Sequence, residues 1–210
     1  MTVTQSLLAF TLAAGLLTIT PGLDTALVLR AAAARRAVGG AMAAAGIALG
    51  CLVWGAVVAL GLGALLAASE AAYAVLKLLG AAYLIFLGVK LIVSPRSAVD
   101  LAGGAGEGRG DARRWLARGL LTNLLNPKIG VFYISFLPQF VPQGVPVGPY
   151  MFGLTVLHVV LGLIWFAVLI AALRPLRRFL ERPTVVRWLD RSIGVMFTGF
   201  GVRLALSRAG

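Results

Sequence analysis

Residues 147–173 read VGPYMFGLTVLHVVLGLIWFAVLIAAL, a stretch without a single Asp, Glu, Lys or Arg. A helix needs about 20 apolar residues to cross the roughly 30 Å hydrocarbon core of a bilayer. This stretch exceeds that length, and a helix that is apolar on every side is not stable when it is fully exposed to water. It therefore predicts a transmembrane helix, and the remainder of the chain can be searched for others of the same kind.

The whole chain shares this apolar character. Of its 210 residues, 60% are hydrophobic and only 12% are charged, whereas a soluble domain carries about 25% charged residues. The mean hydropathy is +0.96. A soluble fold of this length cannot bury so much apolar surface, because a large part of its area must face water. The composition therefore excludes a soluble enzyme, a disordered tail and a collagen-like repeat.

The apolar runs define a set of predicted transmembrane spans. We place them at residues 5–29, 39–68, 71–93, 116–140, 147–173 and 189–207. Only helices and closed barrels satisfy the backbone in lipid, and the runs show no alternation of period two. We therefore expect an all-α membrane protein with six transmembrane helices. No Lys or Arg precedes Arg30, so residues 5–29 lack the positive start of a cleaved signal peptide.

The net charge of +12 comes from cations that gather at alternate connections. Those in or beside the first, third and fifth connections are Arg30, Arg35, Arg36, Lys90, Arg96, Arg109, Arg113, Arg114, Arg118, Arg174, Arg177, Arg178, Arg182, Arg187 and Arg191. The second and fourth connections hold none. The positive-inside rule then places the odd connections in the cytoplasm and both termini outside. We interpret the basic charge as a signal of orientation and of contact with the lipid bilayer, and expect no nucleic-acid partner.

The chain reads as a single transmembrane domain, residues 1–210, made of two halves. A glycine-rich cytoplasmic linker, residues 94–115, separates the halves 1–93 and 116–210. Related short motifs occur in corresponding spans: Gly15-Leu-Leu-Thr18 and Gly119-Leu-Leu-Thr122, Lys77-Leu-Leu-Gly80 and Arg191-Ser-Ile-Gly194, Gly88-Val-Lys90-Leu and Gly201-Val-Arg203-Leu. Because each half has three spans, the second half enters the membrane the other way up. The pattern predicts two inverted three-helix repeats, a transporter architecture; the alternative is chance matching among common Gly and Leu residues.

The first span carries a predicted helix break at Pro21 and Gly22. Proline lacks a backbone N–H and clashes with the carbonyl four residues before it, and glycine adds backbone freedom. Breaks of this kind persist inside a membrane where they line a cavity. Asp24 follows the break, and a bare carboxylate there costs about 2.5–3.5 kcal/mol on insertion scales. It therefore has to pair, take up a proton or face water.

The fourth span repeats the same combination of a polar group, a proline, a charge and a glycine. Its residues are Asn123, Asn126, Pro127, Lys128 and Gly130. Lys128 lies too deep to reach an interface easily by extending its side chain. An Asp24–Lys128 pair between the two broken helices would keep both charges in the membrane. The alternative is a purely structural ion pair with two proline kinks.

The two breaks together suggest a ligand with both signs of charge. A half-helix N-terminus favours anions, while freed carbonyls and a carboxylate favour an ammonium group. A zwitterion such as an amino acid fits both, with Lys128 on its carboxylate and Asp24 on its amino group. Asp24 could also carry a coupling proton. The candidate substrate-binding residues are Pro21, Gly22, Asp24, Thr25, Asn123, Asn126, Pro127 and Lys128.

Other polar and aromatic residues in the spans are weaker candidates. Cavity lining is assigned to Thr20, Lys77, Tyr83 and Tyr133. His158 is the only histidine and is interpreted first as a hydrogen-bonded core residue, with proton carriage as the alternative. The single cysteine, Cys51, excludes an internal disulfide. No His, Glu or Cys cluster has the spacing of a metal site, and no phosphate-binding glycine motif occurs, so we expect no cofactor, no metal and no catalytic residues.

Three motifs, taken in order, resemble one family. They are Pro21-Gly22-Leu23-Asp24-Thr25, then Leu79-Gly80-Ala-Ala-Tyr83-Leu-Ile-Phe-Leu-Gly88, then Asn126-Pro127-Lys128-Ile-Gly130-Val-Phe. Together they resemble the lysine-exporter (LysE/RhtB) family of amino-acid exporters over nearly the whole chain. One departure is Leu23, which stands where the family usually has a second proline after Pro21-Gly22, so the break can differ in geometry.

The resemblance implies a small bacterial inner-membrane protein, not an enzyme, that exports amino acids at the expense of the proton motive force. The expected function is thus a secondary active exporter, an antiporter with protons as coupling ion. The sequence does not give the particular amino acid, and it leaves a homo-oligomer open. The alternatives are a metal-cation exporter of a distantly related type, an intramembrane enzyme, for which no catalytic constellation is seen, and a non-transporting membrane adaptor.

Overall fold

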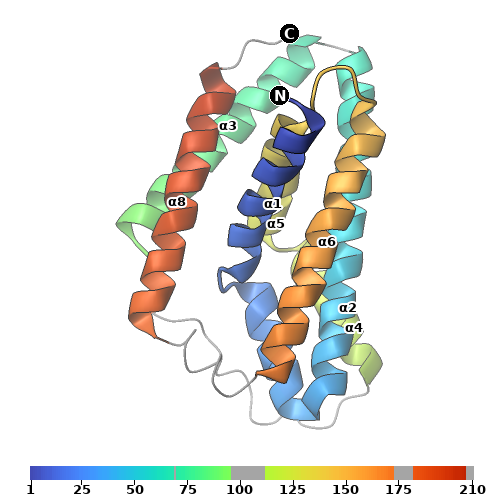
Figure 1. Ribbon diagram of the computed structural model, residues 1–210, viewed down its shortest axis with the longest axis vertical. Coiled ribbons are helices and arrows are strands. Elements are labelled where there is room, and N and C mark those ends of the chain that lie inside the picture. Colours follow the sequence, from blue (N-terminus) through green and yellow to red (C-terminus); the bar gives the residue numbers. More distant parts are fainter. Residues whose placement is uncertain (69, 96–111, 173–181, 207–210) are drawn as a thin grey trace.

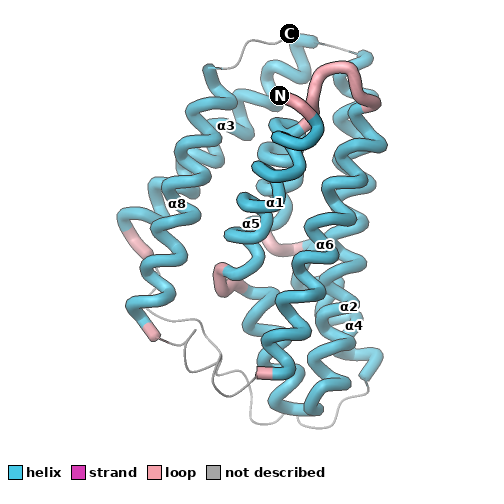
Figure 2. The backbone as a smooth tube through the Cα atoms, in the orientation of Figure 1, coloured by secondary structure: helices cyan, strands magenta, loops and turns pink. Residues whose placement is uncertain are grey.

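The computed structural model describes residues 1–68, 70–95, 112–172 and 182–206, and these form helices joined by short connections (Figures 1 and 2). In chain order the elements are α1 (Val3–Ile19), α2 (Leu23–Ala68), α3 (Glu70–Val93), α4 (Ala112–Leu124), α5 (Pro127–Val131), the π-helical turn η1 (Phe132–Phe136), the 3₁₀ turn η2 (Leu137–Phe140), α6 (Val147–Ala171) and α8 (Pro183–Leu206). No strand occurs in these ranges, so the all-α prediction is confirmed for them.

Two bent helix pairs occur at the predicted breaks. The chain bends by 53° between α1 and the first part of α2, across Thr20–Gly22. It bends by 52° between α4 and the segment that starts at Pro127. Proline explains both positions, because it removes a backbone donor and its ring displaces the carbonyl four residues before it. The prediction of breaks in the first and fourth spans is confirmed.

The first connection differs from the prediction. A loop was expected between the spans ending at residue 29 and starting at residue 39, but the backbone stays helical throughout α2. The helix nevertheless turns back on itself at the lower end of the molecule (Figure 1). A Cβ added at Gly40 would lie 3.1 Å from the Cβ of Ala32, whereas eight residues of straight helix span about 12 Å. The sequence between them is mostly alanine and arginine, which are strong helix formers, so the turn keeps helical hydrogen bonds.

Two other boundaries also differ from the prediction. Helix α4 begins at Ala112 and so takes in the last residues of the expected linker 94–115. Helix α8 begins at Pro183 rather than at residue 189. Both extensions carry exposed arginines. These residues lower the hydropathy, so they were not counted in the predicted spans, although arginine is readily accommodated in a helix. Residues 96–111, 173–181 and 207–210, with the cations predicted there, lie outside the described residues.

The structure accounts for part of the six predicted transmembrane spans. Ala37–Gly61 and Val147–Ala171 are long and apolar enough to cross a membrane, and counting each bent pair as one span brings the total to four. The predicted spans at 71–93 and 189–207 correspond to α3 and α8. Among the described side chains of α3, Leu78–Val93 form an apolar helical stretch, and α8 includes Arg191 and Arg203.

The helices form two groups with a central layer between them (Figures 1 and 2). Helix α3 packs lengthwise on α8, while α2 packs on α4 and α6. Helices α1 and α5 lie between the groups (Figure 1). Helices α3 and α8 approach closely because glycines lie between them: a Cβ added at Gly194 would lie 2.6 Å from the carbonyl oxygen of Gly88. The small residues allow the two backbones to touch, as in many membrane helix pairs.

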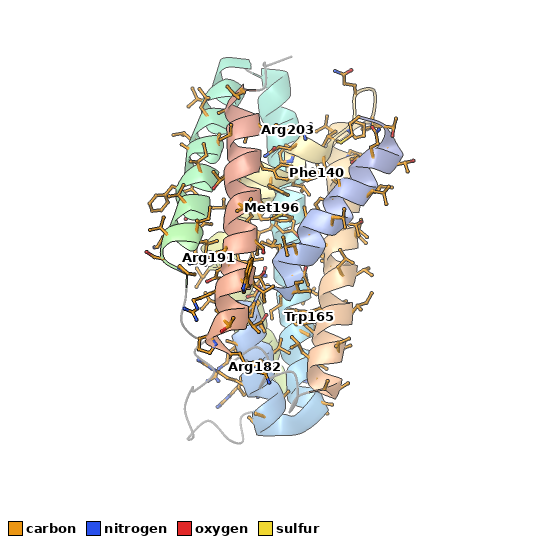
Figure 3. The ribbon with its side chains drawn as sticks, turned by 60° about the vertical axis from the view of Figure 1, so that its left-hand side comes forward. Phe140, Trp165, Arg182, Arg191, Met196 and Arg203 are labelled. Carbon is orange, nitrogen blue, oxygen red and sulfur yellow. The ribbon has the colours of Figure 1, made fainter. Side chains whose placement is uncertain are left out.

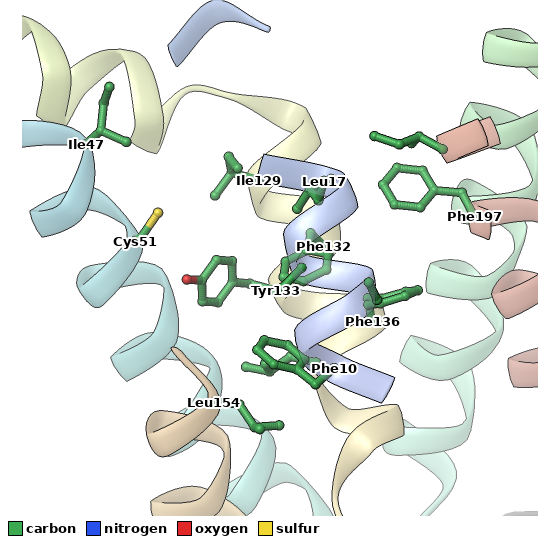
Figure 4. Packing of buried hydrophobic residues seen from close by; sticks show 14 of the residues in the cluster. Phe10, Leu17, Ile47, Cys51, Ile129, Phe132, Tyr133, Phe136, Leu154 and Phe197 are labelled. Carbon is green, nitrogen blue, oxygen red and sulfur yellow. The ribbon is translucent and has the colours of Figure 1, made fainter. Parts of the chain in front are cut away.

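Aromatic rings pack together at the centre of the molecule, where Phe10, Phe132 and Phe136 are fully buried (Figure 4). We call Phe10, Phe132, Phe136, Phe140 and Phe200 the aromatic cluster. The ring centroids of Phe136 and Phe200 are 4.2 Å apart, and those of Phe10 and Phe140 are 5.4 Å apart. Next to the cluster, the hydroxyl of Ser6 donates to the carbonyl of Phe140 and accepts from the hydroxyl of Tyr150 at 2.8 Å. These contacts join α1, η2 and the start of α6 at one end of the molecule.

Candidate functional site

A cavity lies beside the two helix breaks. Its empty space, counted together with its open mouth, is about 530 Å³. Both bent spans and the helices α2 and α6 form its walls. Its polar or break-associated lining residues are Thr18, Thr20, Gly22, Asp24, Thr25, Cys51, Asn126, Lys128 and His158.

Asp24 supplies the negative charge of the cavity. It stands in the first turn of α2, where the unpaired N–H groups of the helix favour a carboxylate. Its Oδ2 accepts a hydrogen bond of 2.9 Å from Nδ2 of Asn123 in α4. The carboxylate is 9% exposed and Asn123 is completely buried. The bond therefore ties the first bent pair to the second near the breaks.

Lys128 supplies the positive charge. Its Nζ donates to the carbonyl oxygens of Leu17 at 3.0 Å and Thr20 at 3.1 Å. These carbonyls belong to the end of α1, where the break leaves backbone acceptors without helical partners. An ammonium group at a helix C-terminus is also favoured by the helix dipole. The break in the first span therefore exposes the backbone carbonyls that bind Lys128 of the fourth span.

The second break positions Lys128 through a helix cap. The side chain of Asn126 accepts a hydrogen bond of 3.1 Å from the backbone N–H of Lys128 and caps α5, with Pro127 at the first helical position. Asparagine is among the best N-cap residues, and proline at this position loses no helical hydrogen bond. The motif Asn126-Pro127-Lys128 is thus a helix start whose third residue points across to α1.

The two charges act on each other across the cavity. Asp24 and Lys128 both line it, and the ammonium group exerts an electrostatic attraction on the carboxylate. Nζ of Lys128 lies 3.6 Å from the position that a Cβ on Gly22 would occupy. The buried Oδ1 of Asp24 accepts no hydrogen bond from the described residues. An acceptor of this kind is suited to a donor supplied by a ligand or to a proton.

The other predicted residues fall in several places. Pro21 lies in the first break, and Thr25 is buried at the cavity wall. Tyr133 is completely buried, and its hydroxyl lies 3.0 Å from Nδ1 of His158, which itself lines the cavity. Tyr83 is 40% exposed and has its ring beside that of Phe86, 6.1 Å away. The side chain of Lys77 lies outside the described residues.

Sequence reasoning missed the apolar wall of the cavity. The residues are Leu17, Ala44, Ile47, Ala48, Ile129, Val159, Gly162, Leu163 and Phe166. They read as ordinary span residues, so no pattern marked them. Cys51 was considered only for disulfides, yet its Sγ lies 3.4 Å from Nδ2 of Asn123. Asp190, a completely buried carboxylate in α8, also escaped notice and does not line this cavity.

The described residues bring together no group of three or more His, Cys, Asp or Glu side chains that could hold a metal ion. The charged lining of the cavity in this part of the chain consists of Asp24 and Lys128.

Fold and site together define a helical membrane protein with a charged cavity at two helix breaks. The family model of the LysE type translocators matches residues 16–208, and the chain belongs to this family. The resemblance seen in the three motifs is thereby confirmed.

Several relatives match over most of their length. A threonine efflux protein of Escherichia coli (strain K12) is 30% identical over 201 residues, covering 90% of this chain and 92% of the relative. A leucine efflux protein of Klebsiella pneumoniae is 30% identical, covering 94% and 93%. An uncharacterized membrane protein of Bacillus subtilis, YrhP, is 29% identical, covering 97% and 100%. No solved structure matches the chain.

Proposed function

We propose that this chain is a secondary active exporter of amino acids in a bacterial inner membrane, driven by protons. Membership of the LysE type translocator family supports transport, and relatives named threonine and leucine efflux proteins support amino acids as cargo. The observation that carries the proposal is the pair of opposite charges, Asp24 and Lys128, in one cavity at two helix breaks.

The cavity chemistry matches the backbone of an amino acid. The amino group of a substrate donates to the carboxylate of Asp24, whose Oδ1 accepts no hydrogen bond from the described residues. Its carboxylate accepts from the ammonium group of Lys128, which the carbonyls of α1 hold in place. Asp24 also serves as the proton carrier in this proposal, because substrate and proton compete for the same carboxylate. That competition is a simple basis for exchange.

The proposal includes the side of the membrane toward which the cavity opens. Along α6, Tyr150 belongs to the end closed by the aromatic cluster, while His158 to Phe166 line the cavity farther on. In α2 the lining residues lie nearer to the turn after Ala34 than to the end at Ala68. Figure 3 shows Arg182 toward the end where α2 turns back and Arg203 toward the other. With the basic end in the cytoplasm, the cavity faces inward and both termini are outside.

The proposal also keeps the single domain of six spans with two inverted repeats, 1–93 and 116–210, joined by the linker 94–115. Bends of 53° and 52° at corresponding positions support it. So do the glycine contacts between α3 and α8. Gly88 contacts Gly194, and a Cβ on Gly201 would lie 2.9 Å from the carbonyl oxygen of Ala81. With Gly88 matched to Gly201, a two-fold axis would exchange these two contacts if Ala81, one residue after Gly80, is matched to Gly194.

The proposal is tested by efflux from bacteria that lack their own amino-acid exporters and are fed with dipeptides. We expect wild type to release one or a few amino acids, and release to stop when the proton gradient is collapsed. Asp24→Asn and Lys128→Ala should each abolish efflux while membrane levels stay normal. Lys90→Ala, an exposed lysine of α3, is the matched control and should transport normally. Normal efflux from both site variants would contradict the site, and efflux that survives the collapse would contradict proton coupling.

A further inference from the structure

A chain of buried polar side chains connects Asp24 to His158. The amide nitrogen of Asn123 donates to Oδ2 of Asp24 at 2.9 Å and to Sγ of Cys51 at 3.4 Å. The hydroxyl of Tyr133 points toward α2 (Figure 4), where it contacts Cys51, and it lies 3.0 Å from Nδ1 of His158. Asn123 and Tyr133 are completely buried, and the other members are nearly so. The chain begins and ends at the cavity, because Asp24 and His158 both line it.

The charge of Asp24 sets the direction of these hydrogen bonds. An ionised carboxylate can only accept, so Asn123 gives one amide proton to Asp24 and the other to Cys51. The sulfur of Cys51 is then an acceptor from Asn123, and its own proton is left for the oxygen of Tyr133. With its oxygen accepting from Cys51, the hydroxyl of Tyr133 can donate its proton to Nδ1 of His158.

The second ring nitrogen of His158 then becomes a donor toward the cavity. A neutral imidazole carries one N–H, so a hydrogen bond accepted at Nδ1 leaves the proton on Nε2. This Nε2 makes no hydrogen bond to a described residue. Thr155 also contacts the hydroxyl of Tyr133, but it donates its proton to the carbonyl of Met151 and supplies none to the chain.

The polar lining residues of α1 offer no comparable donor. The hydroxyls of Thr18 and Thr20 donate to the carbonyls of Ala14 and Leu16, at 2.7 and 2.9 Å. Their protons are therefore engaged within the helix.

Lys128 lies near enough to His158 for its charge to act on the ring. Two donors on one part of the cavity suit the two oxygens of a carboxylate. We propose that Nε2–H of His158 binds the carboxylate of the amino acid together with Lys128, and that Tyr133 positions the ring for it. This inference rests on the proposed function.

The tautomer can be observed directly, because His158 is the only histidine of the chain. The full chain is labelled with ¹⁵N-histidine, reconstituted in proteoliposomes and studied by NMR. The proton should be found on Nε2, and the Nε2 resonance should shift when the amino acid that exchanges fastest is added. That amino acid is found by screening the labelled protein amino acids for exchange. Tyr133→Phe should move part of the proton to Nδ1, because the donor that fixes the tautomer is gone.

Two replacements of His158 separate binding from packing. The amide nitrogen of a glutamine can reach the position of Nε2, and that of an asparagine the position of Nδ1. His158→Gln should therefore bind the amino acid nearly as wild type does. His158→Asn should raise the half-saturating concentration for exchange by about tenfold or more, the loss of one hydrogen bond to a charged group. A maximal rate close to wild type will show that each variant is folded.

The contradicting outcomes separate this inference from the proposed function. A proton on Nδ1 in wild type, or an Nε2 resonance that the exchanged amino acid does not shift, would overturn the inference while amino-acid transport stands. Normal binding by His158→Asn with weak binding by His158→Gln would do the same, since it would show that His158 only holds Tyr133. No exchange of any protein amino acid by reconstituted wild type would overturn the proposed function and the inference with it.

Discussion

Asp24 and Asn123 show how a carboxylate can be kept inside a membrane protein. Asp24 is 9% exposed, and its Oδ2 accepts a hydrogen bond from Asn123, which is completely buried. The start of α2 adds favourable N–H groups. These contacts reduce the desolvation cost of the carboxylate, and they leave its Oδ1 without a hydrogen bond from the described residues.

Replacement of the donor is predicted to destabilise the protein. Asn123→Leu keeps a similar volume but leaves the carboxylate of Asp24 buried without its donor, which costs about 1–3 kcal/mol. The free energy of unfolding in detergent micelles measures this loss. The double variant Asp24→Leu/Asn123→Leu should regain most of it, because replacing both partners by apolar groups of similar shape is nearly neutral.

The double variant also decides the interpretation. If the two losses add instead of cancelling, the hydrogen bond between Asp24 and Asn123 is not the source of the effect. In either case the double variant should not transport amino acids, because it lacks Asp24, the residue proposed to bind the substrate.

At the residue scale, the sequence marked the charged part of the site because charges inside apolar spans stand out. Asp24, Asn126 and Lys128 all line the cavity, as expected from their depth beside Pro21 and Pro127. The apolar wall carried no such mark. Gly162 and Leu163 resemble every other residue of a charge-free span, and only the packing of α6 against α2 makes them lining residues.

At the scale of elements, the glycines between α3 and α8 fix how closely these helices approach. A Cβ on Gly194 would lie 2.6 Å from the carbonyl oxygen of Gly88 and 3.1 Å from the backbone nitrogen of Ile92. Backbone atoms cannot rotate away as a flexible side chain can. The contact therefore admits glycine alone unless the helices separate.

Gly194→Val is predicted to separate α3 from α8 and to destabilise the protein by about 1–3 kcal/mol, the usual cost of overpacking. Thermal unfolding in detergent, followed by circular dichroism, measures the change. Gly199→Val lies on the same helix, where an added Cβ meets nothing within 4 Å, and should melt close to wild type. Equal melting of both variants would contradict the close α3–α8 contact.

The helix breaks were predictable at this scale because proline acts locally, through its missing N–H and its ring. The first connection was not. Hydropathy separates two apolar runs at the arginines near Arg30, and helix α2 turns back in this region (Figure 1). Hydropathy does not report backbone conformation, and an alanine-rich segment keeps its helical hydrogen bonds through a turn.

At the scale of the whole molecule, the cavity and the aromatic cluster lie on opposite sides of the breaks. Phe10 and Phe140 close the end that contains Tyr150, while Gly162 lies on the open side. The cations of the sequence predict an orientation of the chain in the membrane, but no sequence pattern predicts this asymmetry. Which side of the two breaks is closed depends on side-chain packing between distant segments.

The central claim is that amino acids pass through this cavity, which opens toward the cytoplasm. The measurement that tests it most directly is block of export by a membrane-impermeant thiol reagent in the variant Gly162→Cys. Wild type sets the baseline for any reaction of its single cysteine, Cys51, which lines the same cavity but is only 6% exposed. Gly153→Cys, on the outer surface of α6, is the control for labelling away from the cavity.

We predict that reagent applied to the cytoplasmic face labels Gly162→Cys and stops its amino-acid export at least about tenfold faster than in wild type. The same reagent applied outside should leave export unchanged, as should labelling of Gly153→Cys. Full labelling of Gly162→Cys with undiminished export would show that the cargo takes another path, and block from the outside alone would reverse the proposed orientation.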